Sequence, residues 1–123
     1  MTGLSLQELT TDQLVGRFVE NTLAQDEALL EGERAQFNRL FTEMRAILEE
    51  LTARKGDQRR TLFPLYDHPN SQVRLKAAKN TLALAPDEAR NVIQAIASSG
   101  EYPQAGEAGM CLRNLDAGVF KPS

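Results

Sequence analysis

The sequence predicts an all-α protein, arranged as a short α-α superhelix of five or six helices, and three observations support this prediction. Apolar residues recur at steps of three and four through most of the chain, and no alternating strand pattern competes with this spacing. Gly32, Pro69, Pro86 and Pro103 interrupt the apolar pattern where helices are expected to end or begin. Residues 71–84 are rich in alanine and carry apolar residues on two adjacent faces, which indicates a helix enclosed between neighbours.

The composition is that of a globular protein with one modest core, so residues 1–123 are expected to form a single domain. Of the 123 residues, 41% are hydrophobic and 25% are charged, which argues against disorder. No apolar run approaches the ~18 residues that a membrane span needs, and the first residues lack the pattern of a secretion signal. Cys111 is the only cysteine, so an intramolecular disulfide is impossible and a reducing cytoplasm is the expected location.

Residues 1–55 are expected to form an amino-terminal helical cap. Thr10 with Gln13 fits a capping box, which predicts the start of a first helix. This helix either breaks before Gly32 or continues up to it, and both outcomes stay open. A second helix is predicted over residues 34–54 from one apolar stripe, formed by Phe37, Leu40, Phe41, Met44, Ile47, Leu48 and Leu51.

A corner at Pro69 is expected to join the next two helices. The first of them starts near Asp57 and contains Pro64, which lies near a first turn or kinks the helix because it has no amide donor. Pro69 disfavours helical geometry at the residue before it, so this helix ends at the corner. The second helix starts at a capping residue, Asn70 or the serine after it, and its alanines let neighbouring helices approach closely.

Two more helices are expected before the chain ends. One is predicted over residues 86–97, with a proline suited to its first turn, and the other starts near Pro103. Gly106 and Gly109 share one side of the last helix, where close backbone contact with the preceding helix is expected. The chain closes with a tail in which Phe120 is expected to fold back as a plug.

Residues 57–84 resemble a HEAT repeat, in which two antiparallel helices form one unit. The stretches that carry the resemblance are "LFPLYDHPN" and "VRLKAAKNTLAL", where Asp67 in the turn and Arg74 after a valine match the family pattern. The resemblance implies that Arg74 reaches toward Asp67 and orders the corner, so both residues are expected to be structural. Residues 86–117 would then form a degenerate second pair, followed by residues 118–123 as the tail.

The chain as a whole resembles a family of small bacterial proteins with an armadillo/HEAT-like fold and no assigned function. The stretches that carry this resemblance are "TLAQDEALLEG", "HPNSQVRLKAAKNTLALAP" and "SGEYPQAGEAGM", which together span most of the chain. The resemblance implies the fold and a bacterial source, and it brings no catalytic residue with it.

Charge is spread unevenly along the chain, although the net charge is only −3. Residues 1–53 hold ten acids and four bases, whereas residues 54–79 hold seven bases and two acids. Such a bipolar surface favours oriented contact with a partner. Ordinary solvated helix faces also vary in charge to this extent, so both interpretations stay open.

Basic side chains in and near the fourth predicted helix are the candidates for partner binding. Gln72, Lys76 and Lys79 recur at steps of four and three, which predicts one outward face opposite the packed faces. Arg59 and Arg60 lie at the preceding corner. In HEAT-like folds the second helix of each pair lines the concave side, so the resemblance implies that the two lysines project into a groove. A solvated lysine face without a partner is the competing interpretation.

The sequence gives no support for catalysis, a cofactor or a metal site, so a non-enzymatic protein is expected. A metal site needs several ligands brought together, and the chain has one histidine and one cysteine. His68 and Cys111 would act as a nucleophile pair only in hydrogen-bond contact, and structural roles are expected for both. The glutamate pairs at residues 31 and 33 and at residues 49 and 50 are expected to be solvated helix faces rather than acid–base pairs.

We therefore expect a protein-binding module that uses a HEAT-like groove near residues 72–83, as an adaptor or a toxin-neutralising protein. A basic groove of this kind fits an acidic protein partner. The alternative is a nucleic-acid-binding helical-repeat protein, which the acidic composition and the lack of interleaved aromatic residues disfavour. No contact with a membrane is expected, and the oligomeric state stays open.

Overall fold

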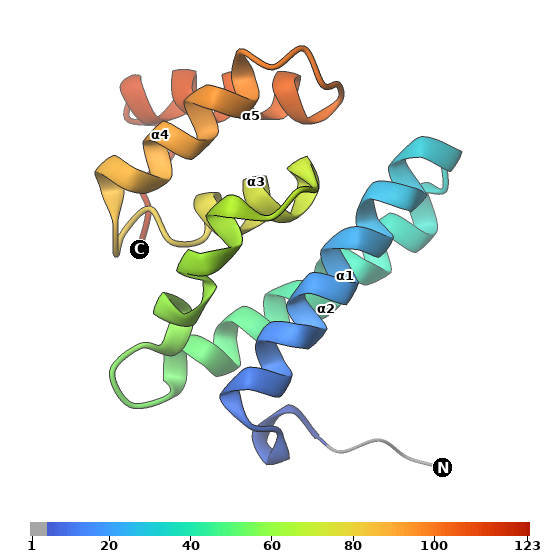
Figure 1. Ribbon diagram of the computed structural model, residues 1–123, viewed down its shortest axis with the longest axis vertical. Coiled ribbons are helices and arrows are strands. Elements are labelled where there is room, and N and C mark those ends of the chain that lie inside the picture. Colours follow the sequence, from blue (N-terminus) through green and yellow to red (C-terminus); the bar gives the residue numbers. More distant parts are fainter. Residues whose placement is uncertain (1–4) are drawn as a thin grey trace. The chain divides into compact units, whose positions relative to one another are not determined.

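A computed structural model describes residues 5–123, and helices account for all of its regular structure (Figure 1). These residues form five α-helices and two 3₁₀ helices, with no strand in the described range, which confirms the all-α prediction. The chain divides into two units, Met1–Thr61 and Leu62–Ser123. The boundary falls inside the predicted pair at residues 57–84, and the single-domain and superhelix arrangements stay predictions.

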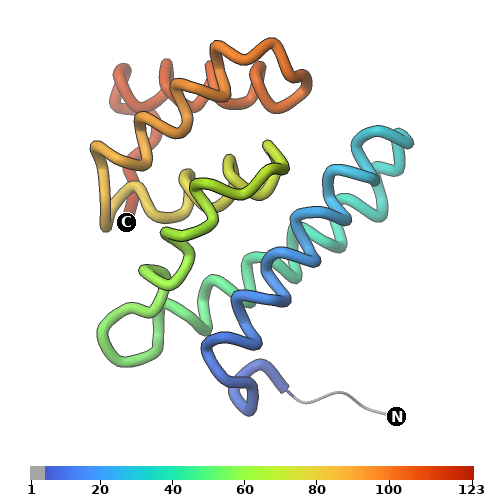
Figure 2. Tube along the Cα trace, viewed as in Figure 1, coloured from blue at the N-terminus to red at the C-terminus, as the bar shows by residue number. Residues whose placement is uncertain are grey.

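The first unit is built on a hairpin of two antiparallel helices, α1 (Thr11–Glu31) and α2 (Arg34–Ala53), which lie side by side (Figure 2). The short 3₁₀ helix η1 (Leu6–Glu8) precedes them. The predicted capping box starts α1, because the Thr10 hydroxyl accepts from the Gln13 amide at 3.1 Å and the Gln13 side chain accepts from the Thr10 amide at 2.8 Å. The helix continues up to Gly32, whose φ of 70° ends it in the left-handed region.

The predicted apolar stripe of α2 forms its packed face. Its buried members are Leu40, Met44, Ile47, Leu48 and Leu51. Its two phenylalanines are half-buried, and their rings stack with centroids 6.4 Å apart. The stripe prediction is confirmed: α1 and η1 pack against α2 within this unit, and charged residues such as Glu43 and Glu49 stay exposed on its other faces.

The packed face of α1 buries neutral polar side chains as well as apolar ones. Asn21, Thr22 and Gln25 are all buried. The Asn21 amide donates to the carbonyl oxygen of Leu40 at 2.9 Å, and the Gln25 amide donates to Asn21 Oδ1 at 2.8 Å. Since a buried polar group must keep its hydrogen bonds, the bond from Asn21 to Leu40 constrains how α1 sits on α2.

The end of α2 is tied back to the start of the chain by Arg54. Its Nη2 donates to the carbonyl oxygens of Leu6 and Leu9 at 3.1 and 2.7 Å, and its Nε donates to Glu50 at 2.9 Å. These bonds close the first unit at the open end of the hairpin.

The third predicted helix forms, but as a 3₁₀ helix, η2 (Gln58–Asp67). Pro64 lies in its interior and supplies no amide donor, which disfavours the continuous hydrogen bonding of an α-helix. Leu62 is its buried residue. The α-helix expected here was therefore wrong in type, although its position was right.

The second unit packs three α-helices: α3 (Ser71–Lys79), α4 (Pro86–Ala97) and α5 (Gln104–Asp116). Asn70 caps α3 as predicted, since its Oδ1 accepts from the amides of Gln72 and Val73 at 2.8 and 3.1 Å. The predicted apolar faces of α3 are buried, which confirms an enclosed helix; these residues are Val73, Leu75, Ala77 and Ala78. The helix ends earlier than expected, at Lys79, and the chain continues through turns to α4.

The core of the second unit is shared by all three helices and the tail. Its buried residues are Leu75, Ala78, Leu82, Ala89, Ile93, Ile96, Ala108, Cys111 and Leu112. Phe120 is partly buried against this cluster, which confirms the predicted fold-back of the tail. The prediction for the glycines of α5 was wrong: Gly106 is exposed beside the ring of Tyr102, and Ala105 and Ala108 are the small residues that α5 buries.

Candidate functional site

The predicted binding stripe on α3 does not face outward. Gln72 is fully buried, and Lys76 is only 5% exposed. The amide of Gln104 donates to Gln72 Oε1 at 3.0 Å. Because α3 contacts both α4 and α5, little of its surface is left free, and the stripe expected to line a groove lies mostly inside the unit. Lys79 alone of the three is partly exposed.

Lys76 forms a buried ion pair with α5. Its Nζ lies 2.6 Å from Oε2 of Glu107, and Nζ of Lys79 lies 3.1 Å from the same oxygen. Burial lowers the pKa of the Lys76 ammonium, and the Glu107 carboxylate offsets only part of that effect. Burial alone would raise the pKa of Glu107, but the two ammonium groups lower it below its usual value. The short contact indicates an ammonium–carboxylate pair at neutral pH.

This ion-pair cluster lies near Cys111, which does not have the environment of a nucleophile. The thiol is buried, and burial raises its pKa. His68 lies at the corner before α3, where its Nδ1 accepts a hydrogen bond from the Asn70 amide at 3.0 Å. Among the described residues no hydrogen bond joins His68 to Cys111. The arrangement supports the structural roles expected for both.

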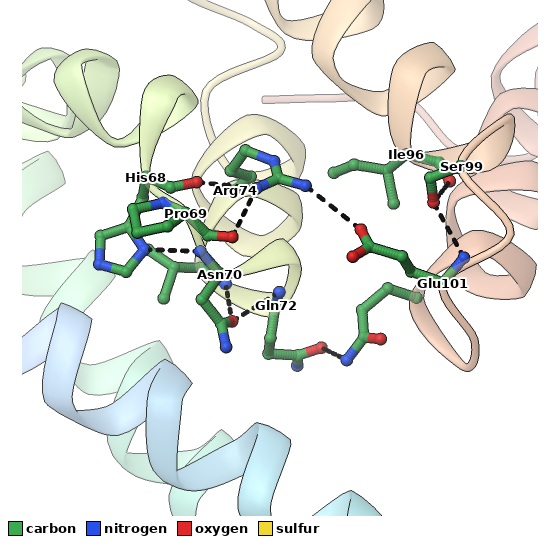
Figure 3. A network of polar contacts seen from close by, with 10 residues as sticks. His68, Pro69, Asn70, Gln72, Arg74, Ile96, Ser99 and Glu101 are labelled. Carbon is green, nitrogen blue, oxygen red and sulfur yellow. Dashed lines mark hydrogen bonds and ion pairs between the residues drawn. The ribbon is translucent and has the colours of Figure 1, made fainter.

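The corner before α3 is ordered by Arg74, but not through the aspartate that the HEAT resemblance implied. Figure 3 shows the Arg74 guanidinium between the backbone carbonyls of His68 and Pro69 on one side and the Glu101 carboxylate on the other. Its Nη1 donates to the carbonyl oxygens of His68 and Pro69 at 2.8 and 3.0 Å, and its Nη2 lies 3.5 Å from Glu101. No ion pair in residues 5–123 joins Arg74 to Asp67, which is exposed.

The two arginines predicted at the preceding corner differ in availability. Arg59 makes a two-point contact with Asp57, with Nε and Nη2 at 2.9 and 2.7 Å from its two carboxylate oxygens. This hydrogen bonding lowers the pKa of the Asp57 carboxyl and raises that of the Arg59 guanidinium. Arg60 is exposed. The structure therefore places Arg59 in a local turn contact and leaves Arg60 at the surface.

The glutamates considered as acid–base pairs occupy two different settings. Glu31 and Glu33 flank the turn between α1 and α2, and both are exposed. The Glu31 pKa is raised by a hydrogen bond with Glu33 and by repulsion from Glu33 and Glu27. Glu50 pairs with Arg54, and Glu49 is exposed. Glu31, Glu33 and Glu49 thus lie on solvated faces as expected, whereas Glu50 is partly buried in its ion pair.

An open groove that the sequence reasoning missed runs along the α1–α2 hairpin, entirely within the first unit. A recess of about 480 Å³ lies between the two helices, and a second recess of about 420 Å³ adjoins it. The two recesses adjoin at Leu6 and Ala46, which line both, and we call them together the hairpin groove. It is defined by the apolar residues Leu6, Ala24 and Ala46 and by the exposed acids Glu20, Glu43 and Glu49.

The sequence carried a weak signal for this groove. Ala24 and Ala46 are small residues beside the packed stripes, so a space is left over the helix–helix seam. Small residues on a helix are common for many reasons, however, and only the pairing of α1 with α2 shows that these two line one depression.

Within residues 5–123 no group of three or more His, Cys, Asp or Glu side chains is placed to hold a metal ion. None of the described helices combines the length and apolar character required to cross a membrane.

These features define a small all-α protein with a buried ion pair in one unit and an acid-rimmed groove on the other. The chain belongs to the family described as a domain of unknown function, DUF2019, whose profile matches residues 12–116. It is similar to the crystal structure of the protein RPA1889 from Rhodopseudomonas palustris CGA009, with 54% sequence identity and a TM-score of 0.94. That match covers 98% of this chain and 100% of the other. No curated protein matches the chain.

The family assignment confirms the expectation of a family without an assigned function, and the similar structure comes from a bacterium. The armadillo/HEAT-like detail of the resemblance stays a prediction.

Proposed function

We propose that the chain is a non-enzymatic protein-binding module, of armadillo/HEAT-like type, that holds its partner in the hairpin groove. The observation that carries this proposal is that two open recesses on the α1–α2 hairpin adjoin at Leu6 and Ala46. Their linings combine apolar side chains with exposed acids from both helices, a combination that suits a peptide-binding surface. An adaptor or a toxin-neutralising protein would use such a surface.

The proposal moves the binding surface from α3 to the α1–α2 hairpin. The α3 lysines are occupied by Glu107, so binding there would require the buried pair to break. The hairpin groove needs no such rearrangement, because its rim side chains are already exposed. The absence of catalysis is part of the proposal, and the burial of Cys111, which raises the pKa of its thiol, argues against that side chain as a nucleophile.

Site-specific photocrosslinking in the producing cells tests this proposal. A photoreactive phenylalanine analogue replaces Ala46 in the groove, and a matched variant carries it at Ala95, an exposed alanine of α4. We expect a discrete protein adduct from position 46 that is absent from position 95. Adding Glu43→Lys to the groove variant should remove the adduct. Equal labelling at both positions, or no adduct at position 46, would reject the groove as the binding surface.

Nucleic-acid binding is the alternative function, and the structure gives it less support. Five of the seven bases between residues 54 and 79 form ion pairs with acids of the chain; they are Arg54, Arg59, Arg74, Lys76 and Lys79. The exposed side chains of Lys55 and Arg60 are the observation in its favour. A salt-dependent gel shift that disappears in a Lys55→Glu/Arg60→Glu variant would support it, whereas no shift by the parent protein would reject it.

A further inference from the structure

We infer that the hairpin groove accepts a single amphipathic α-helix with an apolar face and lysine or arginine along its edges. This inference rests on the proposed function and specifies the chemistry of the partner.

The shape of the groove fits a helix. Its walls are the antiparallel helices α1 and α2, and its floor exposes the small side chains of Ala24 and Ala46 over the buried Leu40 and Ile47. Small residues between two helices allow the backbone of a third to come close. From Leu40 to Glu50 the α2 wall spans about 15 Å, at 1.5 Å per residue, which matches about three turns of a bound helix.

The rim charge selects a basic partner. Glu20, Glu43 and Glu49 are exposed, and no ion pair within residues 5–123 is described for any of them. Arg17 is the single base among the described residues that line the two recesses. Opposite charge along the edges of a docked helix steers its encounter and fixes its orientation. The same rim repels phosphate, so nucleic acids and anionic lipid surfaces are poor occupants.

A second copy of this chain is a poorer occupant than a separate protein. The basic helix it would have to offer is α3, and there Lys76 is buried against Glu107 while Lys79 shares the same carboxylate. Presenting α3 to another molecule would expose the core of the second unit and break this ion pair. The occupant is therefore a helix from a different protein.

A displayed library of helix-forming peptides, each of about 18 residues because shorter isolated helices are marginal in water, tests the inference on the full chain. We expect enriched sequences to combine an apolar stripe with flanking lysine or arginine. Their affinity should fall about tenfold in Glu43→Lys and with rising salt. The matched variant Glu27→Lys, an exposed acid of α1 that does not line the groove, should bind as the parent does.

Further controls separate the possible failures. Ala46→Trp should fill the groove and abolish peptide binding, whereas Ala95→Trp on α4 should not, and circular dichroism of each variant checks that the helices are intact. Enrichment of acidic or extended peptides, or binding insensitive to Glu43→Lys and Ala46→Trp, overturns the inference. So does a dimer in light scattering that Glu43→Lys dissociates. If a protein adduct forms at position 46 but the library yields no basic helical peptides, this inference is wrong and the proposed function is still supported.

Discussion

The α1–α2 hairpin and the α3–α5 unit both bury neutral polar side chains, but among the described residues the second unit also buries a charged one. In the hairpin the buried polar side chains are neutral. The Asn21 amide donates across the helix seam to the Leu40 carbonyl, and the Gln25 amide donates to Asn21 within α1. In the second unit a charged lysine, Lys76, is buried, and its partner Glu107 comes from another helix. Removing a neutral amide costs one hydrogen bond, whereas removing one member of a buried ion pair leaves a desolvated charge.

This difference follows from how many neighbours each helix has. Within the first unit α2 packs against α1 and η1, so most of its surface stays exposed and its charged residues lie at the rim of a groove. In the second unit α3 contacts both α4 and α5, which leaves no outward face for Lys76. The enclosed helix α3 contributes its side chains to the core of the second unit. The α1–α2 hairpin supplies the exposed surface on which the proposed function depends.

The largest effect is expected from breaking the ion pair from its acidic side. Glu107→Ala should lower the free energy of unfolding by about 2–3 kcal/mol, because Lys76 is left charged and buried, while the partial exposure of Glu107 moderates the loss. Urea denaturation followed by circular dichroism measures the change. The double variant Lys76→Met/Glu107→Gln should recover most of it, since no unpaired charge remains. A change below about 0.5 kcal/mol in Glu107→Ala would mean that the pair is not buried in solution.

The pH dependence of stability sharpens the same contrast. The pKa of Glu107 is lowered in the folded state, so its contribution is present above the unfolded value of about 4.3 and is lost as the pH falls through the folded value. Urea midpoints at pH 7 and about pH 3 should therefore differ more in the parent than in Glu107→Gln. Equal differences in the two proteins would show that other carboxylates cause the acid sensitivity.

Much of the fold was predictable because local signals and helical period agree. The capping box at Thr10, the stripe of α2, the cap at Asn70 and the start of α4 at Pro86 all depend on neighbouring residues, and all are found where expected. The type of η2 was not predicted, because an interior proline permits either a kinked α-helix or a 3₁₀ helix.

The candidate site was less predictable because charge does not reveal burial. Lys76 follows the spacing of an exposed stripe, and its actual partner Glu107 lies 31 residues later, on a helix whose packing no local pattern gives. Arg74 likewise lies at the expected corner but meets Glu101 instead of Asp67. The hairpin groove depends on which residues of α1 and α2 face each other, which is a property of the pair rather than of either segment.

A smaller effect is expected in the hairpin. Asn21→Ala should lower the free energy of unfolding by about 1–2 kcal/mol, because the hydrogen bonds to the Leu40 carbonyl and from Gln25 are lost without leaving a charge behind. The matched variant Asn38→Ala, at an exposed position of α2, should change stability by less than about 0.5 kcal/mol. A loss for Asn21→Ala as large as that for Glu107→Ala would remove the distinction between neutral and charged buried groups.

The smallest effect, and one of opposite sign, is expected at the turn of the hairpin. The Glu31 pKa is raised by hydrogen bonding with Glu33 and by repulsion from Glu33 and Glu27, so its ionised form is disfavoured in the folded state. Glu31→Gln should therefore slightly raise the thermal midpoint at pH 7, and this gain should vanish below about pH 4, where the parent carboxyl is protonated. Glu43→Gln removes the same charge from an exposed site of α2 and serves as the control. A lower midpoint for Glu31→Gln at pH 7 would show that Glu31 and Glu33 stabilise the turn. The contrast between repelling exposed acids in the hairpin and a buried ion pair in the second unit would then be wrong.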